Sequence, residues 1–145
     1  SVGAFAVGMG EAALRLAVDH ARSREAFGVP IKDFQGVSHQ LADMACRIEG
    51  ARLLVLQAAE AYDRQEPVTA FSAMAKLQAT EAAQFVIDCA IQIHGARALT
   101  ADHRLAHLYN EVRATRIYEG TSEIQRNLIA RELVSGRIPH LVPEA

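Results

Sequence analysis

The chain has 145 residues, of which 50% are hydrophobic and 22% charged, and its formal net charge is −2. This length suits one domain with a sizeable core, and the composition is that of a soluble globular protein and not of a disordered chain. The slightly acidic balance, with no basic run and no Trp, argues against nucleic-acid binding through phosphate contacts or base stacking.

Residues 1–18 are rather apolar, but they do not match a membrane span, because Glu11 and Arg15 interrupt them. No basic region opens a signal peptide either. Cys46 and Cys89 each lie inside an apolar helical pattern. The spacing leaves a disulfide open, but it favours two buried, reduced thiols in a reducing compartment.

Helical apolar periodicity begins with residues 2–24, an Ala-rich segment. Gly3, Gly8 and Gly10 do not form a phosphate loop, because Glu11-Ala12 stands where Lys and Ser or Thr are needed. We expect these glycines to let another helix pack closely. The pattern stops at Gly28-Val29-Pro30.

Four further helical segments follow, and no strand pattern or internal repeat lies between them. The second covers residues 33–63 with Asp33 as its expected N-cap. The third covers residues 67–95, with Pro67 in the first turn and Gly95 at the end. The fourth and fifth cover residues 103–115 and 122–134, and residues 137–145 are expected to lie on the surface. The expected buried face of the third segment consists of Phe71, Met74, Leu77, Ala82, Phe85 and Cys89.

Long helices with short connections predict antiparallel neighbours. The fold class is therefore all-α, an up-and-down, four-helix-bundle-like domain of about five helices that spans residues 1–145.

The link between the last two predicted helices holds the main candidate for chemistry. Gly120 permits a sharp turn, and Ser122 with Gln125 matches a capping box. Glu119 would then lie on a short elbow just before a helix N-terminus. Its carboxylate could act on a ligand in a groove, or it could simply complement the helix dipole.

A metal site is not expected. A di-iron bundle needs Glu-x-x-His pairs, and the sequence contains none. His103 and His107 share a helix face, as zinc ligands can, but Arg104 replaces the glutamate of a zinc protease. A nucleophilic Cys–His pair is not expected because both cysteines are predicted to be buried.

Three blocks, in register along nearly the whole chain, resemble the acyl-CoA dehydrogenase family. They are Ile117-Tyr118-Glu119-Gly120-Thr121-Ser122-Glu123-Ile124-Gln125-Arg126 with Ile129-Ala130-Arg131-Glu132, Arg24-Glu25-Ala26-Phe27-Gly28 with Ile31 and Phe34-Gln35, and Gln92-Ile93-His94-Gly95. The resemblance covers only the C-terminal helical domain of that family. The family's N-terminal helical domain and middle β-domain are absent from this sequence, so we expect it to be inactive as an isolated domain.

The resemblance implies an FAD-dependent α,β-dehydrogenation of acyl-CoA to trans-2-enoyl-CoA, in which FAD accepts the β-hydride. Glu119 stands at the position of the catalytic base that removes the α-proton, and its backbone N–H would donate to the thioester oxygen. Tyr118 and Gly120 would contact the substrate.

The resemblance also assigns the cofactor contacts and the partners. Arg24 would pair with the FAD pyrophosphate. The adenosine end would meet Phe27 and Gln35, and Gln92, Gly95, Thr121 and Glu123 would add further contacts. These contacts are shared between subunits, which implies a homodimer or a dimer of dimers. Electron-transfer flavoprotein or a similar acceptor would take the electrons, in a bacterial cytoplasm or a mitochondrial matrix.

Three departures from the family pattern concern the flavin site and not the fold. Ala96 replaces a second glycine, Asn110-Glu111 replaces Arg-Asp, and Glu123 replaces a frequent glutamine. Two other functions stay open, namely an acyl-CoA oxidase, in which oxygen reoxidises the flavin, and a non-catalytic helical oligomerisation module derived from the family.

Overall fold

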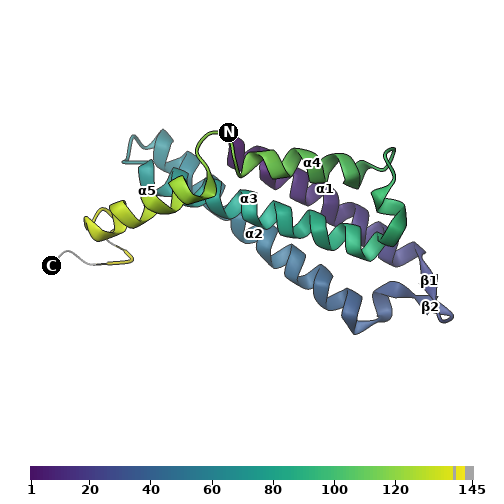
Figure 1. The fold of residues 1–145 in the computed structure, drawn as a ribbon. Coiled ribbons are helices and arrows are strands. Elements are labelled where there is room, and N and C mark those ends of the chain that lie inside the picture. Colours follow the sequence, from purple (N-terminus) through teal and green to yellow (C-terminus); the bar gives the residue numbers. More distant parts are fainter. Residues whose placement is uncertain (139, 143–145) are drawn as a thin grey trace.

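The computed structural model describes residues 1–138 and 140–142, and helices dominate it. The elements in chain order are α1 (Val2–Ser23), β1 (Glu25–Ala26), β2 (Val29–Pro30), the 3₁₀ turn η1 (Ile31–Asp33), α2 (Gln35–Asp63), α3 (Thr69–His94), the 3₁₀ turn η2 (Gly95–Leu99), α4 (Arg104–Thr115) and α5 (Ser122–Val134) (Figure 1). The all-α prediction is confirmed.

Helix α3 is the centre of the fold. It contacts α1, α2, α4 and α5, whereas α5 makes its main contacts with α3 alone. Helices α1 to α4 lie side by side as a bundle, and α5 projects beyond it toward the C-terminus (Figure 1). The link between α4 and α5 lies near the N-terminus of α1, at the opposite end of that helix from the β1–β2 hairpin.

The core is built largely from small side chains. The predicted buried face of α3 was largely wrong, because Ala82 alone of its six residues is buried. The other five are half-buried, namely Phe71, Met74, Leu77, Phe85 and Cys89. A helix with neighbours on several sides approaches them most closely where its side chains are small. The most buried apolar side chains of α3 are Ala73, Ala79, Ala82, Ala83, Val86, Ile87 and Ala90.

Two glycines of α1 allow this close approach. A Cβ atom at Gly10 would overlap Cδ1 of Ile48, and one at Gly3 would lie 3.0 Å from Cγ2 of Val55. A Cβ atom at Gly8 would meet nothing within 4 Å. The prediction of close helix packing is therefore confirmed for Gly3 and Gly10 and wrong for Gly8.

The start of α2 differs from the prediction. Residues Ile31–Asp33 form the 3₁₀ turn η1, so the N-cap of α2 is Phe34. Asp33 pairs instead with Nζ of Lys32 at 2.6 Å. Helix α3 begins at Thr69 and not at Pro67, but it ends as predicted at Gly95, which has a φ of 68°.

A short hairpin was not predicted. Strands β1 and β2 pair antiparallel, with Glu25 opposite Pro30 and Ala26 opposite Val29. Phe27 and Gly28 form the turn with φ angles of 54° and 83°. Two consecutive left-handed residues match the twist of a tight hairpin.

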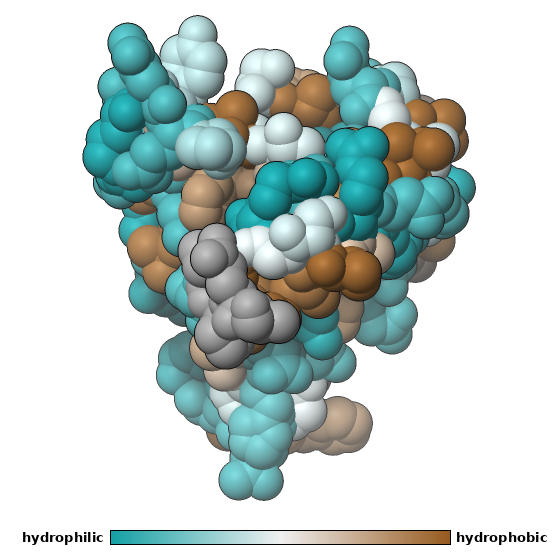
Figure 2. Space-filling model, turned by 90° about the vertical axis from the view of Figure 1, so that its left-hand side faces the viewer, coloured by the Kyte–Doolittle hydropathy of each residue, from teal (hydrophilic) through white to brown (hydrophobic). Residues whose placement is uncertain are grey.

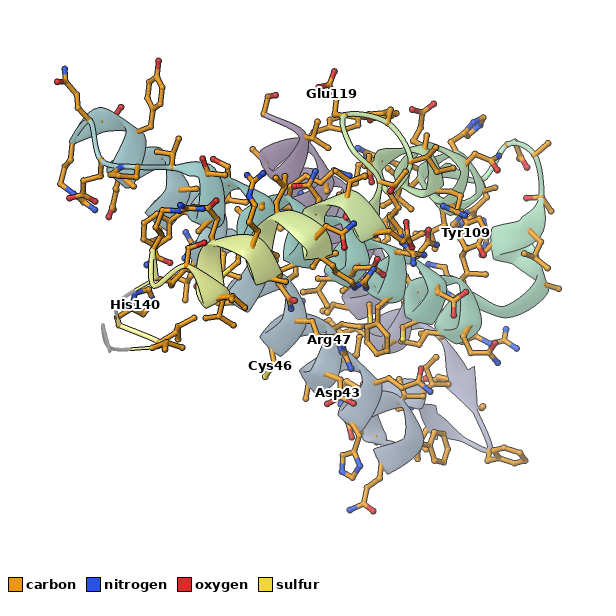
Figure 3. All side chains as sticks on the ribbon, turned by 60° about the vertical axis from the view of Figure 1, so that its left-hand side comes forward. Asp43, Cys46, Arg47, Tyr109, Glu119 and His140 are labelled. Atoms are coloured by element: carbon orange, nitrogen blue, oxygen red, sulfur yellow. The ribbon has the colours of Figure 1, made fainter. Side chains whose placement is uncertain are left out.

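The cysteines and the C-terminal tail also differ from expectation. Both cysteines are free, but Cys46 is exposed on α2 and Cys89 is half-buried (Figure 3). Burial raises the pKa of the Cys89 thiol. The tail was expected on the surface, yet Ile138 is 1% exposed. Pro139 and residues 143–145 lie outside the described residues.

None of the helices in the described part of the chain is both long and apolar enough to cross a membrane. The face of the molecule shown in Figure 2 is mostly hydrophilic, with separate apolar patches between polar side chains.

We predict that Gly10→Val lowers the free energy of unfolding by about 1–3 kcal/mol, because the added methyl groups crowd the contact with Ile48 and Ala83. The matched control is Gly8→Val, which adds the same groups to the open side of the same helix. Urea unfolding followed by circular dichroism checks both. Equal stability of the two variants would contradict the packing described here.

Candidate active site and cofactor pocket

The loop between α4 and α5 has an unusual backbone. Glu119 and Gly120 both adopt left-handed conformations, with φ angles of 55° and 86°. The left-handed φ of Gly120 favours glycine, and a Cβ atom there would also lie 2.6 Å from Nε2 of Gln125, which would have to move. For Glu119 this conformation costs roughly 1–2 kcal/mol. Surrounding contacts must therefore hold it in place.

Two side chains bind the carbonyl groups of this loop. Nζ of Lys76 donates to the Gly120 carbonyl at 2.6 Å. Nε2 of Gln125 lies 3.3 Å from the carbonyl oxygens of both Glu119 and Gly120. Burial lowers the pKa of Lys76, which is 8% exposed, while the nearby carboxylates favour its charged form. These bonds from Lys76 and Gln125 hold the main chain of the loop in place. The side chain of Glu119 points outward, away from the helices (Figure 3).

Glu81 of α3 joins the two ends of the loop. Its Oε1 and Oε2 accept from Nε and Nη2 of Arg116 at 3.0 and 2.9 Å. Its Oε1 also accepts from the hydroxyl of Ser122 at 2.8 Å. The backbone N–H of Ser122 donates to the Arg116 carbonyl at 3.1 Å, which closes the loop.

The predicted capping box is wrong, although α5 does begin at Ser122. Thr121 is the N-cap, and its hydroxyl accepts from the N–H of Ile124 at 3.3 Å. Ser122 is buried and bonded to Glu81, and Gln125 turns toward the loop carbonyls. Glu123 lies in the first turn of α5, where bonds to its own N–H and to Thr121 lower its pKa.

Glu119 lines a cavity of about 620 Å³ between the start of α1, the end of α2 and the start of α3. The wall is formed mainly by small side chains, and Lys76 and Gln125 lie in it too. In the described part of the chain Glu119 makes no salt bridge, and its backbone N–H has no acceptor. The small residues of the wall are Gly3, Ala4, Ala58, Ala59, Ala73 and Ala75.

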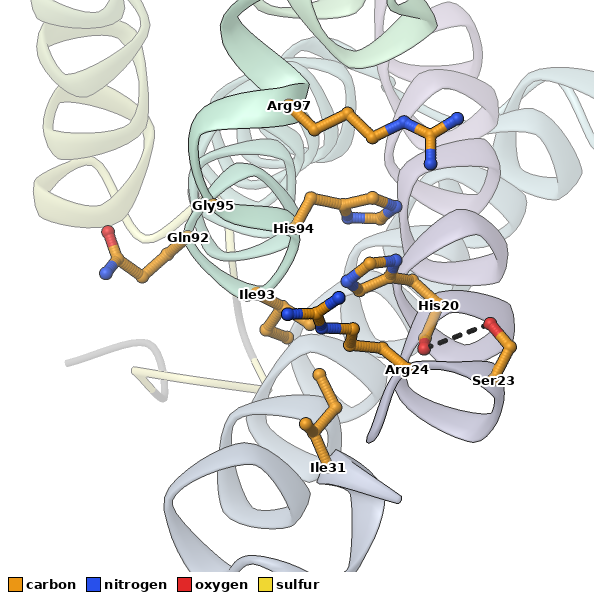
Figure 4. Close-up of a pocket in the computed structure, with 9 residues that line it drawn as sticks. All are labelled: His20, Ser23, Arg24, Ile31, Gln92, Ile93, His94, Gly95 and Arg97. Atoms are coloured by element: carbon orange, nitrogen blue, oxygen red, sulfur yellow. Dashed lines mark hydrogen bonds between the residues drawn. The ribbon is translucent and has the colours of Figure 1, made fainter. Parts of the chain in front are cut away.

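A second cavity of about 560 Å³ lies at the other end of α1 (Figure 4). It contains no carboxylate. Among the described residues, Arg24 and Arg97 have no acidic partner within 4 Å. Arg24, Gln92 and Gly95, which the resemblance assigns to FAD, all lie in the wall of this cavity. The lining residues are His20, Ser23, Arg24, Ile31, Gln92, Ile93, His94, Gly95 and Arg97.

Two histidines without a predicted site role, His20 and His94, line this cavity. The rings of His20 and His94 stack at 4.3 Å, and His103 meets His94 edge-on at 5.2 Å. Burial and the neighbouring positive groups lower the pKa of His20, and burial chiefly lowers that of His94. In Figure 4 these two rings lie between the guanidinium groups of Arg24 and Arg97. Both rings are therefore neutral at pH 7.

His103, considered above as a zinc ligand, caps α4 by accepting from the N–H of Leu105 at 3.2 Å. Within the described ranges no group of three or more His, Cys, Asp or Glu side chains is placed to hold a metal ion.

The predicted site residues therefore fall into two groups. Tyr118, Glu119, Gly120, Thr121 and Glu123 lie at the α4–α5 loop. At the far end of α1, Phe27 is 97% exposed at the hairpin tip and packs edge-on against Phe34 at 6.2 Å. Gln35 is exposed at the start of α2 there, close to the Arg24 cavity. Helix α1 has 22 residues, which places the two groups roughly 30 Å apart.

We predict that acidification destabilises the fold. The pKa of His94 is lowered in the folded state, so the unfolded state binds more protons as pH falls below about 6.5. The melting temperature should fall between pH 7.5 and 5.5, and His94→Gln should reduce this slope. His107→Gln, at an exposed position, is the control that keeps the slope. If the melting temperature of His94→Gln fell with pH as steeply as that of the unchanged chain, His94 would not be a source of the acid destabilisation.

The family described as "Acyl-CoA dehydrogenase, C-terminal domain" matches residues 1–134. Acryloyl-CoA reductase (NADH) of Anaerotignum propionicum is 45% identical over 133 residues, which is 92% of this chain and 34% of the reductase.

Two solved structures have the same fold. Butyryl-CoA dehydrogenase from Megasphaera elsdenii aligns with a TM-score of 0.90 and 38% identity, over 92% of this chain and 35% of the enzyme. An FAD complex of PigA aligns with a TM-score of 0.88 and 33% identity, over 91% and 34%. The chain thus spans about a third of the length of these relatives. It belongs to the acyl-CoA dehydrogenase family and corresponds to that family's C-terminal domain.

Proposed function

We propose that this chain is the C-terminal domain of an FAD-dependent acyl-CoA dehydrogenase, which converts acyl-CoA to trans-2-enoyl-CoA. It would act together with an N-terminal helical domain and a middle β-domain, for which the greater length of the relatives leaves room. The observation that carries the proposal is the carboxylate of Glu119, which makes no salt bridge in the described structure and stands on a fixed loop at a cavity.

The geometry of the loop suits a general base. A base must reach the proton that it removes before its basicity matters, and the outward-facing carboxylate of Glu119 can reach a ligand in the cavity. Because the Glu119 N–H has no acceptor in the described structure, it can donate to the thioester oxygen and stabilise the developing enolate. The small side chains of the wall leave room for an acyl group beside it.

The Arg24 cavity fits the pyrophosphate of FAD. Helices α1 and α3 both end there, and their C-terminal dipoles alone would repel an anion. The positive charges of Arg24 and Arg97 oppose this repulsion and attract an anion. A guanidinium group can also form two parallel hydrogen bonds with phosphate oxygens. The neutral imidazole of His20 has one N–H that can donate a further hydrogen bond, whereas Nδ1–H of His94 already donates to the Ala90 carbonyl at 2.8 Å. FAD would supply the acceptor for the β-hydride, which no side chain can provide.

The distance between the two groups supports a shared cofactor site. With the base at one end of α1 and the phosphate-binding residues at the other, a single chain would contribute its base to one flavin and Arg24 to another. We therefore propose a homodimer or a dimer of dimers. Electron-transfer flavoprotein or a similar acceptor would reoxidise the flavin, in a bacterial cytoplasm or a mitochondrial matrix.

A non-catalytic helical module is a weaker explanation. Such a module would need helix faces for association, but it would have no use for a strained glutamate whose carbonyl and neighbouring carbonyl are held by Lys76 and Gln125. Strained residues that the surrounding structure holds in place cluster at functional sites.

We predict that Glu119→Gln in the full-length enzyme slows flavin bleaching by acyl-CoA under anaerobic conditions by at least about 10²-fold, because the base is removed while the shape stays. FAD content and substrate binding should change little. Stopped-flow absorbance measures the rate. Near-normal flavin reduction in this variant would place the base elsewhere in the protein.

We also predict that Arg24→Gln weakens FAD binding at least about tenfold, since a charge-assisted bond contributes roughly 1.5–3 kcal/mol. Fluorescence titration of the apoprotein with FAD checks this. Arg22→Gln, an exposed change two residues away on α1, is the control that keeps the affinity. If both variants bound FAD equally well, the cavity at Arg24 would not be the binding site of the FAD pyrophosphate.

A further inference from the structure

Helix α3 supports the α4–α5 loop through Glu81, whose carboxylate binds a residue on each side of Glu119. We propose that Glu81 is the positioning residue for the catalytic base, an inference that rests on the function proposed above. Its two oxygens accept from Arg116 at 3.0 and 2.9 Å and from the Ser122 hydroxyl at 2.8 Å. Arg116 directly follows α4, and Ser122 is the first residue of α5.

The loop needs such an anchor because its own conformation is unfavourable. Two consecutive left-handed residues, Glu119 and Gly120, lie between the points that Glu81 holds. Within the described structure, one backbone hydrogen bond, from Ser122 to Arg116, links the two ends of the loop directly. The bidentate pair with Arg116 fixes direction as well as distance. It is also partly shielded, since the side chains of Arg116 and Glu81 are 32% and 29% exposed.

Glu81 acts at a distance from the chemistry. It lines neither of the two cavities, whereas Lys76, the other anchor on α3, lies in the wall beside Glu119. A change at Lys76 would therefore alter substrate contacts and loop position together. A change at Glu81 reaches the reaction through the loop and through the charge that Glu81 places near Lys76, without touching the cavity itself. Small displacements matter there, because a misplacement of about 1 Å can lower a rate about 10²-fold.

The test uses the full-length enzyme with bound FAD and the variant Glu81→Gln, which keeps the shape but loses the charge. Two rates are measured, namely the exchange of the acyl-CoA α-hydrogens with deuterated solvent and the anaerobic reduction of the flavin in a single turnover. Both rate constants should fall at least about tenfold, while FAD content, acyl-CoA affinity and the amplitude per bound flavin stay unchanged. Glu81→Asp, which retains the carboxylate, should recover part of both rates.

Two controls separate this role from others. Glu49→Gln breaks a similar bidentate pair with Arg52 on the surface of α2 and should leave both rates unchanged. Arg116→Gln removes the same interaction from the side of the loop, so it tests the proposal even if Glu81→Gln does not fold. The double variant Glu81→Gln, Arg116→Gln should be no slower than Glu81→Gln alone, because Glu81→Gln already removes the charge that pairs with Arg116 and, at 3.8 Å, with Arg126.

The outcomes are distinct. Unchanged rate constants in Glu81→Gln and Arg116→Gln would overturn the proposal, and so would a lower amplitude with a normal rate constant, which signals a folding defect only. Glu119→Gln is measured in parallel. If it keeps both rates, the proposed function itself is wrong, whereas a slow Glu119→Gln beside a fast Glu81→Gln overturns the positioning role alone.

Discussion

Close packing against α3 is the constraint on which the rest of the structure depends. Because α3 presents mainly alanines to its neighbours, α1 can lie against it along its whole length. This contact places the start of α1 beside the α4–α5 loop and the end of α1 beside the end of α3. The same helix carries Lys76 and Glu81 to the loop and His94 to the other cavity. One central element thus builds both candidate sites.

The two ends of α1 have opposite electrostatic character. At the α4–α5 loop, Glu119 has no salt-bridge partner in the described structure and lies at the edge of a cavity with small side chains. At the other end, two guanidinium groups surround imidazoles whose pKa values burial lowers. The first arrangement suits proton removal, and the second suits an anion. A reaction that needs a base and a phosphate-containing cofactor would use both, and their separation is the basis for the proposed homodimer or dimer of dimers.

The helices could be predicted from the sequence because their apolar period is long and clear, and α5 has the predicted bounds of Ser122–Val134. The β1–β2 hairpin could not, since strands of two residues leave no alternating pattern. The cap of α5 was misassigned because Thr121 and Ser122 are both suitable cap residues. A contact with Glu81, 41 positions earlier in the chain, decides between them. Helical periodicity relates residues a few positions apart, so it cannot predict a contact between residues this far apart in the chain.

One signal of the loop support was present in the sequence. Lys76 lies on the same helix face as Ala73, Thr80 and Ala83, all of them buried, at the spacing of one helical stripe. A buried lysine needs a partner, but the sequence does not show that the partner is the Gly120 carbonyl. The left-handed backbone of Glu119 could not be predicted from the sequence either, because glycine is the residue that typically indicates such a conformation.

The central claim is that the fold holds the carboxylate of Glu119 against the reacting carbon. The most direct measurement is a crystal structure of the full-length enzyme with FAD and a non-oxidisable acyl-CoA analogue. We predict a carboxylate oxygen of Glu119 about 3–3.5 Å from the α-carbon, with the Glu119 N–H directed at the thioester oxygen. A structure in which another carboxylate faces the α-carbon, with Glu119 turned to solvent, would contradict it.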